Sequence, residues 1–470
     1  MSPTYDLIIK GGIVVLPDGC QETDIAVKDG VIAAIGRFTD SEAEAERIHD
    51  AAGLTVLPGA VDIHVHFNEP GLGSWEGFAS GSASLAAGGV TTYVDMPLNG
   101  VPPTVSAEAF ALKLDRAEGA SYVDYALWGG LVPGNQDELA GLADRGAVGF
   151  KAFMSEPGGE GEDIFARADD VTLLEGMREI ARLGGLLALH AESEAITKEL
   201  AARLQAEGST DMQAYLASRP VIAEAEAVNR ALLYARHTGC ALHFVHISSV
   251  QALELIDAAK AEGLNVTAET CPHYLCLTDE DAVRIGAVAK CAPPLRDQAN
   301  RELMWEAFRS GSIDVIASDH SPCPPEMKLS ENYFEIWGGI SGAQSTLPIM
   351  IEEGHIKRGI ALERIAEATA FAPARRTGLA YRKGSIEVGK DADFALVDFS
   401  NSFVLQPADL LYRHKQSPYS GYAFSHSIAA TFCRGYQVYE RGTGVIDGRR
   451  GSYIPGKKSS VGVRGTAYAR

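Results

Sequence analysis

Apolar positions along the chain follow two different rhythms. Residues 5–36 alternate apolar and polar positions in short steps, with Gly and Asp at the turns, as in Gly11-Gly12 and Asp29-Gly30. This pattern is typical of short strands joined by hairpins. A similar pattern returns late in the chain, around residues 384–397. We therefore predict a small β-domain assembled from both chain ends, residues 1–54 and 385–450.

Between these ends, apolar strand-like runs alternate with helix-period stretches such as 171–183, 224–237 and 250–262. The eight strand candidates are 55–63, 90–96, 122–128, 147–153, 185–190, 241–246, 264–269 and 313–318. This alternation predicts an α/β fold with a (β/α)₈ barrel of TIM type over residues 55–384. An open doubly wound sheet is the alternative, but no glycine-rich phosphate loop follows the first strands.

The composition narrows the possible partners and compartment. Lys and Arg total 41 against 62 for Asp and Glu, which gives a net charge of −21. Nucleic acids and anionic membranes favour basic surfaces, so we expect neither as a partner. The N-terminus resembles no signal peptide, no apolar run is long enough to cross a membrane, and the seven cysteines contain no Cys-x-x-Cys pair. These features favour a cytoplasmic protein with free thiols. Residues 451–470, rich in Gly, Ser, Lys and Arg, are predicted to form a tail, either mobile or packed on another subunit.

The first barrel strand is predicted to end in Asp62-Ile63-His64-Val65-His66. Residues two apart on a strand point to the same side, so His64 and His66 should present two imidazoles together. Paired imidazoles at a strand end are suited to a divalent metal ion of zinc type. The alternative is a pair of hydrogen-bonded histidines beside a loop.

Four further metal-competent side chains lie in or at the ends of later predicted strands. They are Lys151, His190, His246 and Asp319. The functional residues of a (β/α)₈ barrel gather at the C-terminal ends of its strands, so we expect all six side chains to converge on a metal site. His243 lies an odd number of residues before His246 and is expected to pack on the opposite face.

Lys151 stands between Phe150 and Phe153 in a buried strand. Burial disfavours an ammonium ion, so this lysine either pairs with a carboxylate or has reacted with carbon dioxide to form a carbamate. A carbamate is an anion with two oxygens and can bridge two metal ions.

Taken together, Asp-x-His-x-His, the lysine, the two later histidines and the final aspartate resemble the cyclic amidohydrolases, which include dihydroorotases, dihydropyrimidinases (hydantoinases) and allantoinases. The resemblance implies that His64, His66 and Asp319 hold one divalent ion, that His190 and His246 hold a second, and that carboxylated Lys151 bridges them. Zinc is the expected metal, with iron, manganese or cobalt as alternatives. The family also implies that a metal-bridging hydroxide attacks a ring amide, that Asp319 transfers the proton, and that the subunits form a homotetramer.

Residues near the predicted ligands separate the branches of this family. Dihydroorotases carry an arginine for the substrate carboxylate two places after the second motif histidine, where this chain has Asn68. Dihydropyrimidinases carry a tyrosine five places after the lysine, where this chain has Glu156. The loop 157–161 that follows is predicted to be a flexible lid.

Three runs look most like the allantoinase branch: residues 95–99, 318–328 and 337–342. The resemblance therefore implies hydrolysis of the neutral ureide allantoin to allantoate in purine catabolism. Asn99, Ser321, Cys291 and Gly339 are the predicted substrate contacts, because a neutral ureide needs amide-matching polar groups rather than a charged partner. The alternatives are a dihydropyrimidinase, a dihydroorotase, or a non-catalytic scaffold on the same fold.

Overall fold

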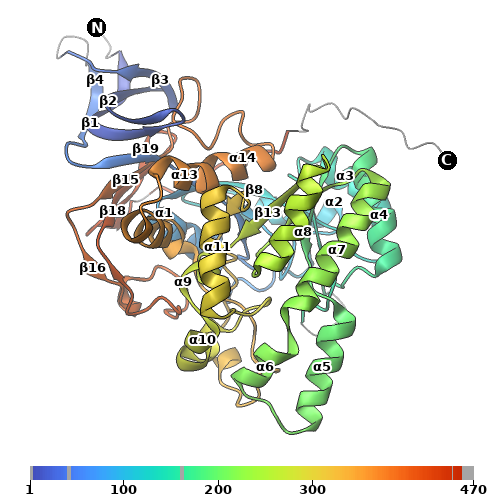
Figure 1. Cartoon of the computed structure of the whole chain (residues 1–470). Helices are drawn as coiled ribbons and strands as arrows, with labels where there is room; N and C mark the ends of the chain where they lie inside the picture. Colours follow the sequence, from blue (N-terminus) through green and yellow to red (C-terminus); the bar gives the residue numbers. More distant parts are fainter. Residues whose placement is uncertain (1–3, 40–43, 159–163, 447, 458–470) are drawn as a thin grey trace.

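The computed structural model describes residues 4–39, 44–158, 164–446 and 448–457. Eight parallel strands form a barrel, and helices alternate with them along the chain (Figure 1). The barrel strands are β6 (Ala60–Val65), β7 (Val90–Asp95), β8 (Asp124–Leu127), β10 (Phe150–Phe153), β11 (Leu186–His190), β12 (Ala241–Phe244), β13 (Val266–Thr270) and β14 (Val315–Ile316). The two-residue strand β9 (Gly129–Gly130) pairs with β10. The predicted barrel is confirmed.

Single backbone contacts join the two open sheets into a ring. Val65 at the end of β6 forms a parallel bridge with His320, just beyond β14. On the other side, the Val148 N–H donates to the Leu127 carbonyl at 3.1 Å, which links β8 to the start of β10. The strand ends that carry the predicted ligands therefore surround one opening.

The helices that follow the barrel strands lie outside the ring. They are α1 (Phe78–Ala87), α2 (Ala107–Ala117), α3 (Leu139–Asp144), α4 (Asp170–Arg182), α5 (Glu194–Ala206), α6 (Met212–Ser218), α7 (Val221–Thr238), α8 (Val250–Ala261), α9 (Pro272–Cys276), α10 (Asp279–Ile285), α11 (Gln298–Ser310), α12 (Thr346–Ile349), α13 (Leu362–Ala366) and α14 (Ala372–Arg376). None of the described helices is long and apolar enough to cross a membrane.

A nine-stranded sheet combines the two chain ends. Its N-terminal strands are β1 (Tyr5–Leu16), β2 (Gly19–Lys28), β3 (Val31–Gly36), β4 (Ala45–Asp50) and β5 (Thr55–Pro58), and its C-terminal strands are β15 (Phe394–Asp398), β18 (Ser427–Cys433), β19 (Tyr436–Glu440) and β20 (Gly444–Val445). The short strands β16 (Phe403–Val404) and β17 (Ala423–Phe424) form a separate pair. Figure 1 shows the blue and red-orange strands beside the barrel. Buried side chains from both ends, such as Ile25 and Phe394, share one core.

The run predicted as the first barrel strand, 55–63, is two strands in different sheets. Thr55–Pro58 pairs with β1 and β15 in the small sheet, and the barrel strand begins at Ala60. Gly59 separates them, and a Cβ atom on it would lie 2.2 Å from the Thr91 hydroxyl oxygen. The apolar run continues through this corner because both strands are buried, so hydrophobicity alone could not locate the break.

Residues 451–457 pack on the barrel of their own chain. Gly451 donates a backbone hydrogen bond to Ser121, Ile454 donates one to Tyr125, and Ile454 is fully buried. This part of the predicted tail is therefore fixed within the subunit, and residues 458–470 lie outside the described part of the chain.

Candidate metal centre

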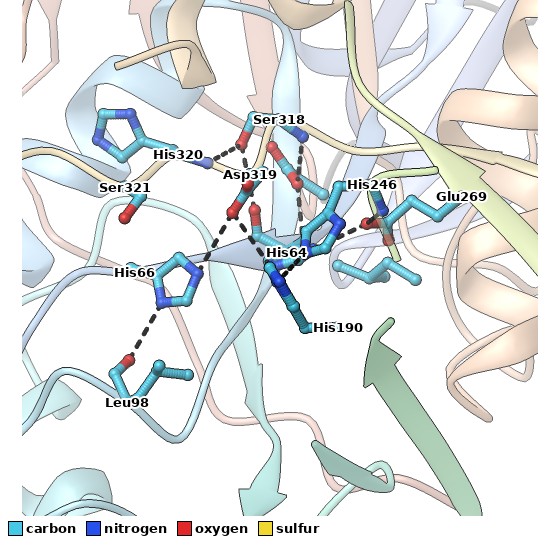
Figure 2. Close-up of polar contacts among 12 residues, drawn as sticks. His64, His66, Leu98, His190, His246, Glu269, Ser318, Asp319, His320 and Ser321 are labelled. Atoms are coloured by element: carbon cyan, nitrogen blue, oxygen red, sulfur yellow. Dashed lines mark hydrogen bonds and ion pairs between the residues drawn. The ribbon is translucent and has the colours of Figure 1, made fainter. Parts of the chain in front are cut away.

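Five of the six predicted ligands converge within direct contact of one another at the open end of the barrel (Figure 2). His64 is on β6 and His66 directly follows it, His190 ends β11, and His246 and Asp319 lie in the loops after β12 and β14. The strand-end rule therefore predicted this cluster from positions spread over more than half of the chain.

The first group consists of His64, His66 and Asp319. One carboxylate oxygen of Asp319 lies 3.2 Å from Nε2 of His64 and 3.3 Å from Nε2 of His66. One ligand atom from each residue fits within a 4.8 Å span. Atoms bound about 2.0–2.1 Å from one tetrahedral zinc ion stand about 3.3 Å apart, so this spacing fits a shared ion.

The second group consists of His190 and His246. Nδ1 of His190 lies 3.0 Å from Nε2 of His246, and the imidazole of His246 lies 5.5 Å from that of His64 between ring centroids. Nδ1 of His246 is buried without a hydrogen-bond partner among the described residues. The two groups are therefore neighbours rather than separate sites.

Lys151 lies close to both groups. Its side chain is fully buried, and its amine has no hydrogen-bond partner in the described part of the chain. The positive charge of Lys151 is near enough to lower the pKa of His64, His190 and His246. Burial lowers the pKa of Lys151 to about 8. No carboxylate hydrogen-bonds to it, so the described contacts do not support the simple ion-pair alternative.

The protonation states in this cluster suit metal ligands. Burial lowers the pKa of His64 and His190, and burial together with the charges of His190 and Lys151 lowers that of His246 well below its ordinary value. Burial opposes ionisation of Asp319, but the nearby imidazoles of His64, His66 and His246 hold its pKa well below the ordinary value. Neutral imidazoles and an ionised carboxylate are the forms that bind metal.

Two buried glutamates hold the histidine rings, and the sequence reasoning missed both. Nδ1 of His64 lies 2.8 Å from Glu269, which also lies 3.1 Å from Nε2 of His243. Nε2 of His190 lies 2.8 Å from Glu192, which forms an ion pair with Arg219. A carboxylate behind a ligand histidine fixes which nitrogen carries the proton and leaves the other free for metal. The sequence signal was present, since Glu192 is two residues after His190 and Glu269 is on β13.

The sequence suggested that His243 only packs on the opposite face, but the structure also gives it polar contacts. Its ring is fully buried and contacts Thr267 at 2.8 Å as well as Glu269. His243 therefore helps to hold the carboxylate that holds His64. Its odd spacing from His246 correctly excluded it from the cluster, but the polar contacts could not be read from spacing.

Asp62 of the histidine motif binds backbone groups rather than the ligand side chains. Its carboxylate accepts hydrogen bonds from the backbone N–H groups of His64 at 3.2 Å and Ser318 at 3.1 Å, which ties β6 to the segment after β14.

Three residues at the site have positive φ angles: Asn68 at 65°, His246 at 41° and Asp319 at 45°. Non-glycine residues adopt this region at an energetic cost, and such strain is concentrated at functional sites.

The four predicted substrate contacts have different structural settings. Asn99 follows Leu98, whose carbonyl contacts Nδ1 of His66 at 3.2 Å, and its amide donates to Asn68 at 3.1 Å. Ser321 is buried two residues after Asp319 on the same loop (Figure 2). A Cβ atom on Gly339 would lie 2.2 Å from the Ser321 carbonyl oxygen, so only glycine fits there. Cys291 is also buried, and its backbone carbonyl accepts the Tyr215 hydroxyl at 2.9 Å.

The two positions that distinguish other branches also have clear structural settings. Asn68 is fully buried, and its amide points to the Pro322 carbonyl at 3.5 Å. Glu156 is exposed and pairs with Arg167 at 3.0 Å. Residues 159–161 of the predicted lid lie outside the described residues.

Comparison with known proteins agrees with this geometry. A profile of the amidohydrolase family matches residues 55–438. The chain is 52% identical to an allantoinase of Rubrobacter xylanophilus over 96% of this chain and 97% of that protein, and 51% identical to an allantoinase of Bacillus velezensis over the same shares. The solved structure of an L-hydantoinase (dihydropyrimidinase) from Arthrobacter aurescens matches with a TM-score of 0.92 and 38% identity, covering 96% of this chain and 100% of that one. Since the profile and these relatives extend over most of its length, the protein belongs to the amidohydrolase family.

Proposed function

We propose that this protein hydrolyses the ring amide of allantoin to give allantoate. The observation that carries the substrate assignment is the identity of about half of all residues, over nearly the full chain, with allantoinases. The convergence of His64, His66, His190, His246 and Asp319 around buried Lys151 supports the chemistry.

In this proposal the two groups hold two divalent ions, zinc being the expected metal. His64, His66 and Asp319 hold one ion, and His190 and His246 hold the other. Lys151, as a carbamate formed with carbon dioxide, would supply oxygen ligands to both ions. The solitary buried amine of Lys151 supports this modification, because a carbamate replaces a costly buried cation by an anion that two cations stabilise.

The bound ions would lower the pKa of a water molecule and polarise the ring carbonyl. Asp319 is the proton carrier, because its ionised carboxylate lies within 3.3 Å of both His64 and His66. The carboxylate accepts a proton as water attacks the carbonyl carbon and donates it to the ring nitrogen as the C–N bond breaks. Protonation is needed because an amide nitrogen otherwise leaves poorly.

The surroundings support a neutral ureide over other rings. Asn68 offers an amide where a dihydroorotate carboxylate would need an arginine. Exposed Glu156 stands where the hydantoin-opening branch carries a tyrosine. Asn99 and Ser321 supply polar groups near the ligands that match the donors and acceptors of a ureide.

The test is a parallel assay of the zinc-reconstituted enzyme with allantoin, dihydrouracil, hydantoin and dihydroorotate. We expect the highest kcat/KM with allantoin. A preference for dihydrouracil or hydantoin would refute the substrate assignment, and a protein that binds less than one metal ion per chain without turnover would support the scaffold alternative. Light scattering on the same sample tests the proposed homotetramer.

A further inference from the structure

Two lysines in the connections that follow β13 and β14 donate to backbone carbonyls instead of carboxylates. The Lys328 ammonium donates to the carbonyls of Trp337 at 2.7 Å, Gly339 at 3.0 Å and Ala287 at 3.1 Å. These three acceptors match the three N–H groups of an ammonium. Lys290, only 5% exposed, donates to the Ile336 carbonyl.

Such an arrangement is costly and therefore unusual. Lysines are almost never buried without a charged partner, yet Lys290 is buried, Lys328 is half-buried, and neither ammonium forms an ion pair with a described carboxylate. Burial lowers the pKa of Lys328 to about 8, and burial with the positive charges of Arg219 and Lys328 lowers that of Lys290 to about 7. Lys290 also lies 4.4 Å from the centre of the Tyr215 ring.

The contacts of these lysines join three chain segments. Lys328 ends the short helix Pro325–Lys328 in the loop after β14, Ala287 begins the short helix Ala287–Ala289, and residues 336–339 form the return of the loop. Cys291 directly follows Lys290, and its carbonyl accepts the Tyr215 hydroxyl from α6. Both lysines thus attach the returning segment, residues 336–339, to residues 287–290.

The loop that contains this returning segment begins at Asp319, one of the predicted metal ligands. Asp319 and His320 directly precede Ser321, whose N–H donates to the Ile340 carbonyl at 3.0 Å and whose carbonyl accepts from the Trp337 indole at 3.3 Å. Because Gly339 leaves no space beside Ser321, a small shift of residues 336–340 displaces Ser321 as well.

We propose that Lys290 and Lys328 are positioning residues that fix residues 336–340 against 287–291 and so shape the substrate-facing wall formed by Ser321, Gly339 and Cys291. This inference rests on the proposed function, since it concerns how allantoin is held rather than how its ring is opened. A wall that holds the ground state and the transition state equally well contributes uniform binding, so its displacement should raise KM and leave kcat nearly unchanged.

The variant Lys328→Met tests the proposal, because methionine keeps most of the length of the side chain and removes every N–H donor. With the zinc-reconstituted enzyme we expect KM for allantoin to rise at least about 10-fold and kcat to change by less than about 3-fold. Metal content should equal that of the parent protein. Lys198→Met is the matched control, because Lys198 is 76% exposed on α5 and should leave both constants unchanged.

A second measurement needs no substrate. Hydrogen exchange of the amides of residues 336–342 should be at least about 10-fold faster in Lys328→Met and unchanged in Lys198→Met. Lys290→Met, which removes the hydrogen bond to Ile336 and the contact of the ammonium with the Tyr215 ring, provides the same comparison if Lys328→Met does not fold. Unchanged exchange in the folded variant, or a loss of kcat with unchanged KM, would overturn the proposal. A parent enzyme that does not hydrolyse allantoin would refute the proposed function instead and would leave the exchange test decisive for the lysines.

Discussion

Replacing Glu269 by glutamine should weaken the metal site at His64 with little change in shape. The Glu269 carboxylate is fully buried and contacts Nδ1 of His64 at 2.8 Å, Nε2 of His243 at 3.1 Å and the backbone N–H of His246 at 3.2 Å. Glutamine fills the same volume but carries no charge. The variant therefore separates the charge of Glu269 from its packing.

The expected magnitude follows from these contacts. A hydrogen bond to a charged group contributes about 1.5–3 kcal/mol, against about 0.5–1.5 kcal/mol between neutral groups, so the change costs about 1–1.5 kcal/mol at His64. The glutamine side chain has one oxygen and one NH₂ group, so its NH₂ group must face a histidine nitrogen that donates to a carboxylate oxygen in the parent protein. That hydrogen bond is then lost. We expect a loss in affinity of about 10–100-fold for one metal ion, which is the usual range for partners behind ligand histidines.

The assay is a zinc titration of metal-free enzyme against a competing chromophoric chelator. Glu192→Gln is the matched control, because Glu192 stands 2.8 Å behind His190 in the other group. Glu269→Gln should lower one of two binding constants, Glu192→Gln should lower the other, and the double variant should lower both. If Glu269→Gln binds zinc as tightly as the parent protein, the charge of Glu269 has no role in the site. If both single variants weaken the same ion, the division of the ligands into two groups is wrong.

Three further outcomes are expected elsewhere in the molecule. Lys151→Ala should abolish turnover while keeping the fold. Bicarbonate added during metal reconstitution should raise the metal uptake of the parent protein but not that of the variant. Equal metal uptake by both proteins would contradict a carbamate on Lys151. Lys383 is fully buried among three aspartates at the junction of the barrel and the small sheet. Lys383→Met should therefore lower the free energy of unfolding, measured in urea, by about 3–5 kcal/mol. A change under about 1 kcal/mol would refute the role of Lys383 as the counter-ion of these aspartates. Burial, opposed by the charge of Glu352, lowers the pKa of His426 from 6.5 to about 4. As the pH falls, His426 is therefore protonated in the unfolded chain before it is protonated in the folded protein. The free energy of unfolding should decrease by up to about 3 kcal/mol as the pH drops from 6.5 to 4. His426→Phe should remove this part of the acid sensitivity in denaturation curves, and an unchanged pH profile would contradict it.

The chain pattern alone predicted the barrel and brought the six candidate ligands to one end of it. This was possible because strand periodicity sets the direction of neighbouring side chains, and because parallel strands in a barrel end on the same side. His64 and His66 could be paired from their spacing, and His246 could be distinguished from His243. These conclusions needed no knowledge of which strands are neighbours.

Contacts between distant segments could not be obtained in this way. Glu269 lies 205 residues from His64 in the sequence, and only the closure of the barrel brings its carboxylate to the imidazole. The corner at Gly59 was hidden for a similar reason, since a buried strand looks alike whichever sheet it joins.

The sequence by itself therefore determined which side chains could hold metal and on which end of the barrel they lie. Only the tertiary structure decided which carboxylates orient the imidazoles, and how Lys290 and Lys328 attach the loop that carries Ser321 and Gly339. The physical reason is that periodicity is a local property of the backbone. The protonation state of a ligand and the position of a loop depend instead on hydrogen bonds between segments that become neighbours only when the barrel closes.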